Sequence, residues 1–312
     1  MGRFGIHLGA GAALVTAAAL AAAGVGERPG ALTDRQAFAL GVVQGLTELL
    51  PISSSGHLIL VPWLAEWEYL ERHDDFNQTF DVALHLGTLV AVTGYFRARI
   101  VELAVAFAAA VRRRAVRSPA ERAAVFVAIA TVPAAIVGAV GEELIAENLG
   151  EPWQIAILLA AFALVLWLAD RRPARRRLDQ LGPREAVLVG LAQSLSLAPG
   201  VSRSGITISA ARLLGLEREE AANLSFLLLV PITAGAVVWK GLNDVVLADL
   251  PPGSAGPFAV GTIAAAGSGL LAIWALLSYV RRRDYTPFVV YRLLAAAAVA
   301  VLILTGVRAA TF

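Results

Sequence analysis

The chain contains no cysteine, which excludes disulfide bonds, thiolate metal sites and cysteine nucleophiles. Charged residues are also scarce: they make up 16% of the 312 residues, whereas hydrophobic residues make up 58%. With a mean hydropathy of +0.69, the chain is far more apolar than an ordinary soluble domain. This composition predicts an all-α polytopic membrane protein.

Lysine is rare, so the basic residues are nearly all arginines, and they gather in blocks at 112–114, 175–177 and 281–283. Each block adjoins an apolar segment. Arginines in such places are typical of the loop charges that set membrane topology. We therefore expect no nucleic-acid partner.

Seven segments approach the roughly 20 apolar residues that a spanning helix needs. They are 8–24, 82–105, 123–141, 153–169, 221–239, 258–280 and 287–307. The first belongs to an N-terminal hydrophobic extension, residues 1–30, and is either a retained helix or a cleaved signal peptide; the inward-facing Arg3 favours retention. The other six form the core of an integral membrane domain that covers residues 31–312.

The loops between these spans differ in charge, which predicts their orientation. Residues 97–122, 171–184 and 281–283 are rich in arginine and should face the cytoplasm. The segments 62–79, 142–151 and 243–256 are acidic or neutral, so we expect them on the outer side.

Two further apolar segments, 36–61 and 185–215, are broken near their middle by Pro, Gly and Ser. The loop charges require each segment to return to the side it entered from, as a re-entrant helix-loop-helix. The two segments also match at an offset of 149 residues, with Gly41, Gln44 and Ser53 over Gly190, Gln193 and Ser202. This pattern predicts inverted-topology repeats, repeat 1 at about 36–141 and repeat 2 at about 185–280, whose broken helices meet near the midplane.

Gln44 and Glu48 are four residues apart, so a helix places them on one face. Glu48 could simply cap a helix or face outer solvent. However, a carboxylate at membrane depth costs about 2.5–3.5 kcal/mol, which favours a functional role as a cation ligand or proton acceptor.

His57 follows the serine run of residues 53–55, and a hydroxyl beside an imidazole can form an activated nucleophile. The alternative is a hydrogen-bonded core histidine.

In the second repeat, Ser202, Arg203, Ser204 and Thr207 follow the helix-breaking pair Pro199-Gly200 and form a candidate anion cradle. Arg203 could also pair with a structural acid such as Glu48, and both roles can hold if that pair closes the empty site. An acid, a histidine and hydroxyls from one repeat, with a cation from the other, favour phosphoryl transfer over ion conduction.

QGLTELLPISSSGH at 44–57 and PGVSRSGIT at 199–207 resemble the two signatures of the undecaprenyl-diphosphate phosphatase family, the BacA type. The resemblance runs from about residue 36 to 308 and includes FDVALHLGTL at 80–89 and NLSFLLLVPITAGA at 223–236. It implies six spans with two re-entrant segments. It further implies hydrolysis of a C55 isoprenyl diphosphate to the monophosphate and inorganic phosphate at the outer face of the bacterial cytoplasmic membrane. This reaction recycles the lipid carrier of peptidoglycan synthesis, confers bacitracin resistance, and depends on a divalent cation such as Mg²⁺ or Ca²⁺.

The resemblance also assigns roles within the two motifs. Glu48, His57, Arg203 and Thr207 occupy functional positions, and Ser54 is the candidate nucleophile, by phosphoserine formation or with water in its place. The expected phosphate contacts are Ser53, Ser55, Ser202, Arg203, Ser204 and Thr207. Glu48 and Gln44 are the expected cation ligands, although Gln44 stands where the family accepts Glu or Gln and provides one fewer anionic ligand.

The competing hypothesis is an inverted-repeat secondary transporter or flippase for an anionic or lipid-phosphate substrate. A lipid-binding protein without turnover is a third option. In each case the expected partners are a polyprenyl diphosphate and membrane lipids, and a homodimer is left open. We expect His85 to be a loop or packing residue, although it lies in the family-like stretch FDVALHLGTL, close to the proposed site.

Overall fold

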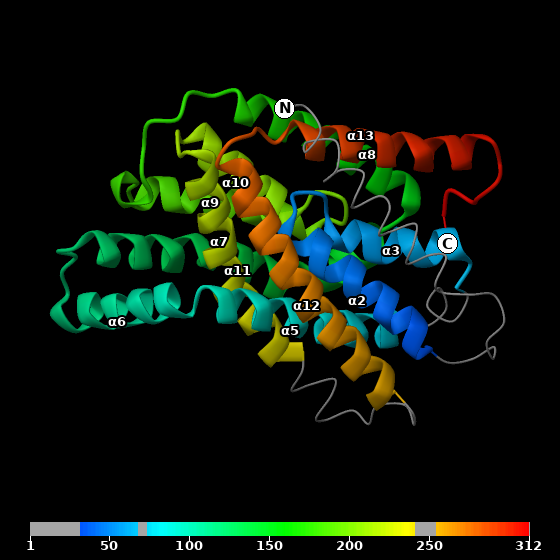
Figure 1. Cartoon of the computed structure of the whole chain (residues 1–312), viewed down its shortest axis with the longest axis horizontal. Helices are drawn as coiled ribbons and strands as arrows, with labels where there is room; N and C mark the ends of the chain where they lie inside the picture. Colours follow the sequence, from blue (N-terminus) through cyan, green and yellow to red (C-terminus); the bar gives the residue numbers. More distant parts are fainter. Residues whose placement is uncertain (1–31, 68–73, 241–253, 312) are drawn as a thin grey trace.

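The computed structural model describes residues 32–67, 74–240 and 254–311, and within them the chain is helical, without β-strands. The helices are α2 (Asp34–Leu49), α3 (Ser54–Ala65), α5 (Asp74–Tyr95), α6 (Arg97–Arg113), α7 (Pro119–Asn148), α8 (Pro152–Asp170), α9 (Pro183–Ser194), α10 (Arg203–Leu213), α11 (Arg218–Lys240), α12 (Ala255–Val280) and α13 (Thr286–Leu304) (Figure 1). The N-terminal extension, with its predicted span at 8–24, lies outside the described residues.

Five of the described helices are long and apolar enough to cross a membrane, and they confirm five of the predicted spans. They are Pro119–Gly141 within α7, Pro152–Asp170, Arg218–Lys240, Ala255–Val280 and Thr286–Leu304. The predicted span 82–105 is wrong in its boundaries, because the helix breaks at Phe96 and the segment contains parts of both α5 and α6. The prediction joined two apolar stretches across the break, because the residue at the break, Phe96, is itself apolar.

The two segments predicted to be broken are both broken helices. Residues 36–61 form α2 and α3, and residues 185–215 form α9, a short 3₁₀ turn (Leu195–Leu197) and α10. In Figure 1, α3 leads back from the inner end of α2 toward the same side of the molecule. Each broken helix therefore presents a turn to the interior.

The two turns share one local geometry. Ser53 and Ser202 each lie directly before a helix. Both have an unusual positive backbone φ, 79° for Ser53 and 76° for Ser202. Each serine hydroxyl accepts a hydrogen bond from the amide three residues on, Gly56 for Ser53 (3.4 Å) and Gly205 for Ser202 (3.0 Å). Positive φ is rare for residues with a side chain and is usually retained where surrounding structure enforces it.

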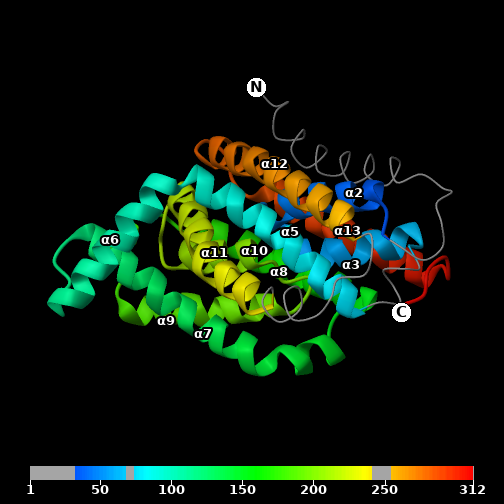
Figure 2. The ribbon, with the colours of Figure 1, turned by 90° about the horizontal axis from the view of Figure 1, so that it is seen from below.

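Glycines allow the close helix contacts that support these broken helices. A Cβ atom on Gly45 of α2 would lie 2.1 Å from Ser268 Oγ, and one on Gly41 would lie 2.3 Å from the carbonyl oxygen of Gly261, both on α12. In the same way, a Cβ atom on Gly190 of α9 would lie 2.6 Å from the Ala130 carbonyl oxygen of α7. Small residues four apart allow membrane helices to approach backbone to backbone. Consequently α2 packs along α12 and α9 along α7 (Figure 2).

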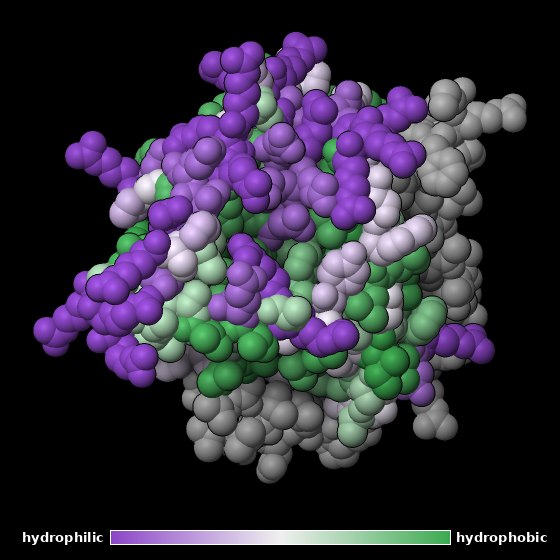
Figure 3. Space-filling view, turned by 60° about the vertical axis from the view of Figure 1, so that its left-hand side comes forward, coloured by the Kyte–Doolittle hydropathy of each residue, from purple (hydrophilic) through white to green (hydrophobic). Residues whose placement is uncertain are grey.

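The arginine-rich loops gather at one end of the molecule, which we call the arginine-rich end. There the buried Asp170 carboxylate accepts bonds from Arg212 Nε (3.2 Å), Arg218 Nε (2.7 Å) and the Tyr285 amide (3.0 Å). Arg281 pairs with Glu219 nearby at 2.8 Å. Figure 3 views this end, where hydrophilic side chains cover the surface beside a hydrophobic band. This gathering agrees with the prediction that these loops share one side of the membrane.

Candidate active site

The turns between α2 and α3 and between α9 and α10 contact each other directly. The Gly200 amide of the second turn donates to Ser53 Oγ of the first at 3.1 Å. Ser204 Oγ donates to the Leu50 carbonyl at 2.9 Å. Residues about 150 positions apart in the chain are thereby brought together, so the two motifs contribute to one site.

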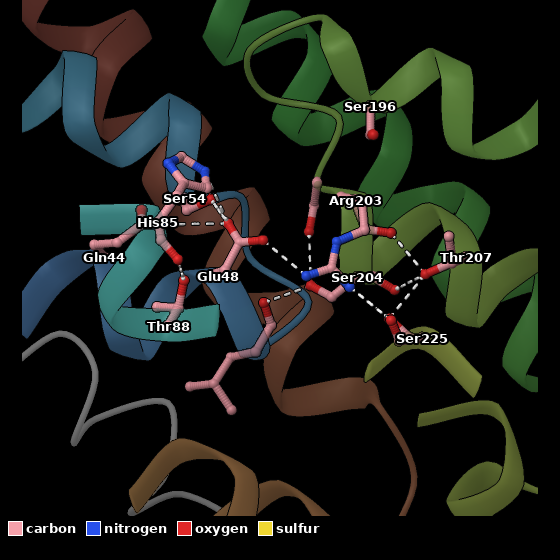
Figure 4. A network of polar contacts seen from close by, with 12 residues as sticks. Gln44, Glu48, Ser54, His85, Thr88, Ser196, Arg203, Ser204, Thr207 and Ser225 are labelled. Atoms are coloured by element: carbon pink, nitrogen blue, oxygen red, sulfur yellow. Dashed lines mark hydrogen bonds and ion pairs between the residues drawn. The ribbon is translucent and has the colours of Figure 1, made fainter. Parts of the chain in front are cut away.

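Glu48 is the centre of this site (Figure 4). Arg203 Nη2 donates to Glu48 Oε1 at 2.7 Å, and the hydroxyl of Ser54 donates to Glu48 Oε2. The Glu48 and Arg203 side chains are only 6% and 11% exposed. The sequence raised this pairing as one role for Arg203, and it joins an acid from one broken helix to the cation of the other.

Two further side chains approach the same carboxylate. Gln44 Nε2 lies 3.5 Å from Glu48 Oε2, as the spacing of four residues on α2 predicts. His85 Nε2 of α5 lies 3.7 Å from the same oxygen, while its Nδ1 donates to the Asp81 carbonyl at 2.7 Å. The sequence predicted a loop or packing role for His85, in a stretch close to the proposed site; the ring lies beside the Glu48 carboxylate and is 32% exposed. Its Nε2 is the ring nitrogen that faces the Glu48 carboxylate.

Arg203 is held from its other side by α11. Its Nη1 donates to the Ser225 carbonyl at 2.7 Å. Thr207 Oγ1 donates to the Arg203 carbonyl at 2.7 Å and lies 2.8 Å from Ser225 Oγ. Sequence reasoning missed Ser225. Its only signal was its place inside the family-like stretch NLSFLLLVPITAGA.

The serines of the two turns differ in how their hydroxyls are used: some cap a helix, and others do not. Ser53 and Ser202 use their hydroxyls to accept the capping bonds of α3 and α10, and Ser202 Oγ lies 3.2 Å from Ser204 Oγ. Ser55 lies in the first turn of α3 and is partly exposed. Ser54 is the serine whose hydroxyl contacts Glu48.

His57 lies apart from the Glu48 carboxylate. Its Nδ1 donates to the Ser53 carbonyl and its Nε2 accepts from the Tyr291 hydroxyl, each at 2.6 Å. The two rings are stacked with centroids 5.6 Å apart, and His57 is 4% exposed. Tyr291 belongs to α13 and carried no signal in the sequence. Both ring nitrogens of His57 are thus engaged in holding the first turn against α13.

The site offers oxygen ligands that suit a hard divalent cation. Gln44 Oε1 is buried and has no hydrogen-bond partner within the described part of the chain, and it lies on the same helix face as the Glu48 carboxylate. No group of three or more His, Asp or Glu residues forms a metal cage among the described residues. One carboxylate and one amide oxygen fit Mg²⁺, which proteins often hold through few ligands together with substrate phosphates.

Known proteins resemble this chain over most of its length. Residues 37–298 match the family model described as "Bacitracin resistance protein BacA". A protein of Geobacter sulfurreducens named undecaprenyl-diphosphatase is 48% identical over 265 residues, which cover 84% of this chain and 96% of that protein. Proteins of the same name from Pelobacter propionicus and Rubrobacter xylanophilus are 45% and 44% identical and cover 87% and 86% of this chain, with 97% and 98% of their own length matched.

These matches include both motifs and the helices that carry Glu48, His85, Arg203 and Ser225. A family model that covers most of the chain and relatives above 40% identity lead to one conclusion. The chain belongs to the bacitracin resistance protein BacA family.

Proposed function

We propose that this protein dephosphorylates undecaprenyl diphosphate to undecaprenyl phosphate and inorganic phosphate, and thereby contributes to bacitracin resistance. The activity named for its relatives supports this substrate. The observation that carries the proposal is the contact of Ser54 and Arg203 with one buried carboxylate, Glu48, where the two turns meet. A hydroxyl with an adjacent base and a fixed guanidinium are the groups that phosphoryl transfer needs.

We further propose that the protein lies in the cytoplasmic membrane with the site open toward the outer face. The arginine-rich end is the predicted cytoplasmic side. Arg212, near the last turn of α10, belongs to that end, whereas Arg203 at the first turn belongs to the site. At 1.5 Å per residue, the 11 residues of α10 separate the site from that end by about 16 Å. The diphosphate would enter at the outer water boundary while its apolar tail lies between the spans.

Diphosphate binding would change the partners of Arg203. In the observed arrangement Glu48 occupies the guanidinium, so an entering phosphate must compete with that carboxylate for Arg203. Because Ser225 holds the other side of the guanidinium, Arg203 can turn toward phosphate while staying anchored. Glu48 is then left to accept a proton from the Ser54 hydroxyl, which already points at it.

In the proposed reaction, Ser54 Oγ attacks the terminal phosphorus as its proton passes to Glu48. The bond between that phosphorus and the bridging oxygen breaks, and undecaprenyl phosphate leaves. His85 Nε2 takes up the proton from Glu48 and passes it to solvent, so that Glu48 can accept a proton from the attacking water. The bond between phosphorus and Ser54 Oγ then breaks, Ser54 Oγ takes that proton from Glu48, and inorganic phosphate is released. Arg203 and the free amides at the start of α3 and α10 neutralise the charge that develops on the phosphoryl oxygens.

A divalent cation and His57 would also contribute to this reaction. Glu48 and Gln44 would hold a divalent cation, which supplies charge neutralisation to the diphosphate. His57, assigned a catalytic position by the resemblance, is proposed to hold the first turn through Ser53 and Tyr291, because both of its ring nitrogens are already bonded there.

Phosphate release by purified protein in detergent tests the proposal and separates it from transport, since transport requires a sealed membrane. Wild-type protein should release phosphate from undecaprenyl diphosphate, EDTA should abolish the release, and Glu48→Gln should reduce it by at least about a hundredfold. Arg281→Gln, which removes an exposed cation at the arginine-rich end, is the matched control and should keep wild-type activity. A folded wild type that binds the lipid without releasing phosphate would overturn the proposal.

A further inference from the structure

Arg292 of α13 is buried with no exposed surface, and it lies outside both sequence motifs. Its guanidinium spans the two turns. Nη2 donates to the carbonyls of Gly200 (2.8 Å) and Val201 (3.1 Å) in the second turn, and Nη1 donates to the Pro51 carbonyl (3.4 Å) in the first. Nε donates to the Leu159 carbonyl of α8 at 3.1 Å. One side chain thus bonds both turns and the helix behind them.

Arg292 has no acidic partner. Within the described part of the chain, no carboxylate forms an ion pair with it, in contrast to Arg212, which is similarly buried but pairs with Asp170. Burying a guanidinium without a counter-charge costs several kcal/mol, and an ionisable group inside a membrane protein usually serves its function. A purely structural link between α13 and α8 would need only the Leu159 bond. The bonds to the turns point to a role in the site.

The carbonyls that Arg292 binds belong to peptide groups beside the reacting residues. The Val201 carbonyl shares a peptide unit with the Ser202 amide, immediately before the start of α10. The Gly200 carbonyl shares one with the Val201 amide, which already donates to the Ala198 carbonyl at 3.2 Å. A cation on a carbonyl oxygen strengthens the donor on the other side of the same peptide unit. The charge of Arg292 is therefore transmitted toward the place where the phosphate is proposed to bind.

Neighbouring residues are fitted to this side chain. A Cβ atom on Gly205 of α10 would lie 2.9 Å from Arg292 Nη1, so the glycine leaves room for the guanidinium. The residue before Arg292, Tyr291, bonds His57 of α3, whose Nδ1 in turn donates to the Ser53 carbonyl of the first turn. Two consecutive residues of α13 therefore fasten the turns that carry both motifs.

We propose that Arg292 is a positioning residue that locks the two turns together and, through the peptide unit between Val201 and Ser202, adds positive potential where the diphosphate is proposed to bind. The proposal rests on the proposed phosphatase function and extends it to α13. It predicts that the hydrolytic step, rather than folding alone, depends on the reach of the guanidinium.

The test compares Arg292→Lys with Arg212→Lys, the matched buried arginine at the other end of α10. For the folded, monodisperse fraction of each variant, kcat and KM are measured for phosphate release from undecaprenyl diphosphate. Lysine at 292 keeps the charge but cannot reach both turns, so we expect kcat to fall about tenfold to hundredfold, with a smaller change in KM. Arg212→Lys should lower the thermal midpoint while keeping the wild-type kcat.

Gly205→Ala provides a second route if Arg292→Lys does not fold, because it leaves the guanidinium intact and displaces it. It should lower kcat in the same direction. A folded Arg292→Lys protein with wild-type kcat and KM would overturn the proposal and leave Arg292 a structural link.

Binding of a methylene-bridged undecaprenyl diphosphonate, measured as a thermal shift, separates the two proposals. A smaller shift in Arg292→Lys than in the wild type, together with a wild type that releases no phosphate, would support a positioning role of Arg292 in diphosphate binding while refuting hydrolysis. If the two proteins show equal shifts, the wild type hydrolyses the substrate and Arg292→Lys has the wild-type kcat, the role of Arg292 is refuted while the phosphatase proposal stands.

Discussion

Replacing Arg203 by methionine removes the cation that joins the two broken helices. The observed guanidinium donates to Glu48 at 2.7 Å on one side and to the Ser225 carbonyl at 2.7 Å on the other. Methionine has a similar length and keeps the apolar contacts of the stem, so the variant tests the charge and the hydrogen bonds rather than the packing. Glu48, which is 6% exposed, would be left as a buried carboxylate without its closest cation.

The substitution should lower both the stability and the kcat. Removing one partner of a buried ion pair costs about 3–5 kcal/mol of stability, chiefly because the remaining charge stays buried. Loss of an arginine that stabilises phosphoryl transfer lowers kcat by about 10³–10⁵. The double variant Glu48→Gln with Arg203→Met removes both charges. It should recover most of the stability while remaining inactive.

Phosphate release in detergent measures the activity, and the thermal midpoint of the same samples measures the stability. The combination distinguishes a chemical role from a structural one, because stability and activity should separate in the double variant. Release by Arg203→Met within about threefold of the wild type would refute the role of the guanidinium in the reaction. Equal destabilisation of the single and double variants would instead refute the energetic importance of the pair.

Four other outcomes are expected. Ser54→Ala should abolish phosphate release, because it removes the hydroxyl that contacts the proposed base; full activity would mean that water attacks directly. His85→Ala should lower kcat about tenfold or more without lowering the thermal midpoint, and an unchanged kcat would exclude it from proton transfer. Gln44→Glu should lower the Mg²⁺ concentration needed for half-maximal activity about tenfold, since it adds a second carboxylate, and an unchanged requirement would exclude position 44 as a ligand. Gly45→Val should destabilise the protein by at least about 1–3 kcal/mol, because its Cβ atom would meet α12 at 2.1 Å; Gly94→Ala, with nothing within 4 Å, is the control and should be neutral, and equal thermal midpoints would contradict the close contact.

Local sequence rules anticipated much of the fold. Long apolar helices follow from hydropathy, since an unpaired backbone in lipid leaves few alternatives to a helix. The breaks in the two re-entrant segments follow from Pro, Gly and Ser within otherwise apolar runs. The break at Phe96 did not, because the flanking stretches of α5 and α6 are both apolar and a hydropathy window merges them.

The sequence likewise predicted only part of the site. Spacing alone places Gln44 beside Glu48, because four residues make about one helical turn, and the observed 3.5 Å contact agrees. The contacts of His85, Ser225 and Tyr291 were not predicted, because each lies on a different helix from the motif residue that it contacts. The role of Arg292 was not predicted for the same reason, and nothing around it in the sequence indicates a buried cation.

By itself, the sequence determined the membrane class, the broken helices and the two polar motifs, because these depend on composition and on neighbours within one or two helical turns. The tertiary structure decided which of those polar groups meet. It brought Arg203 to Glu48 and Ser54, added His85, directed His57 to Tyr291 instead, and linked both turns through Arg292. The physical reason is that hydrogen bonds and ion pairs are short and directional, so a partner that is remote in the sequence is chosen by helix packing and not by local pattern.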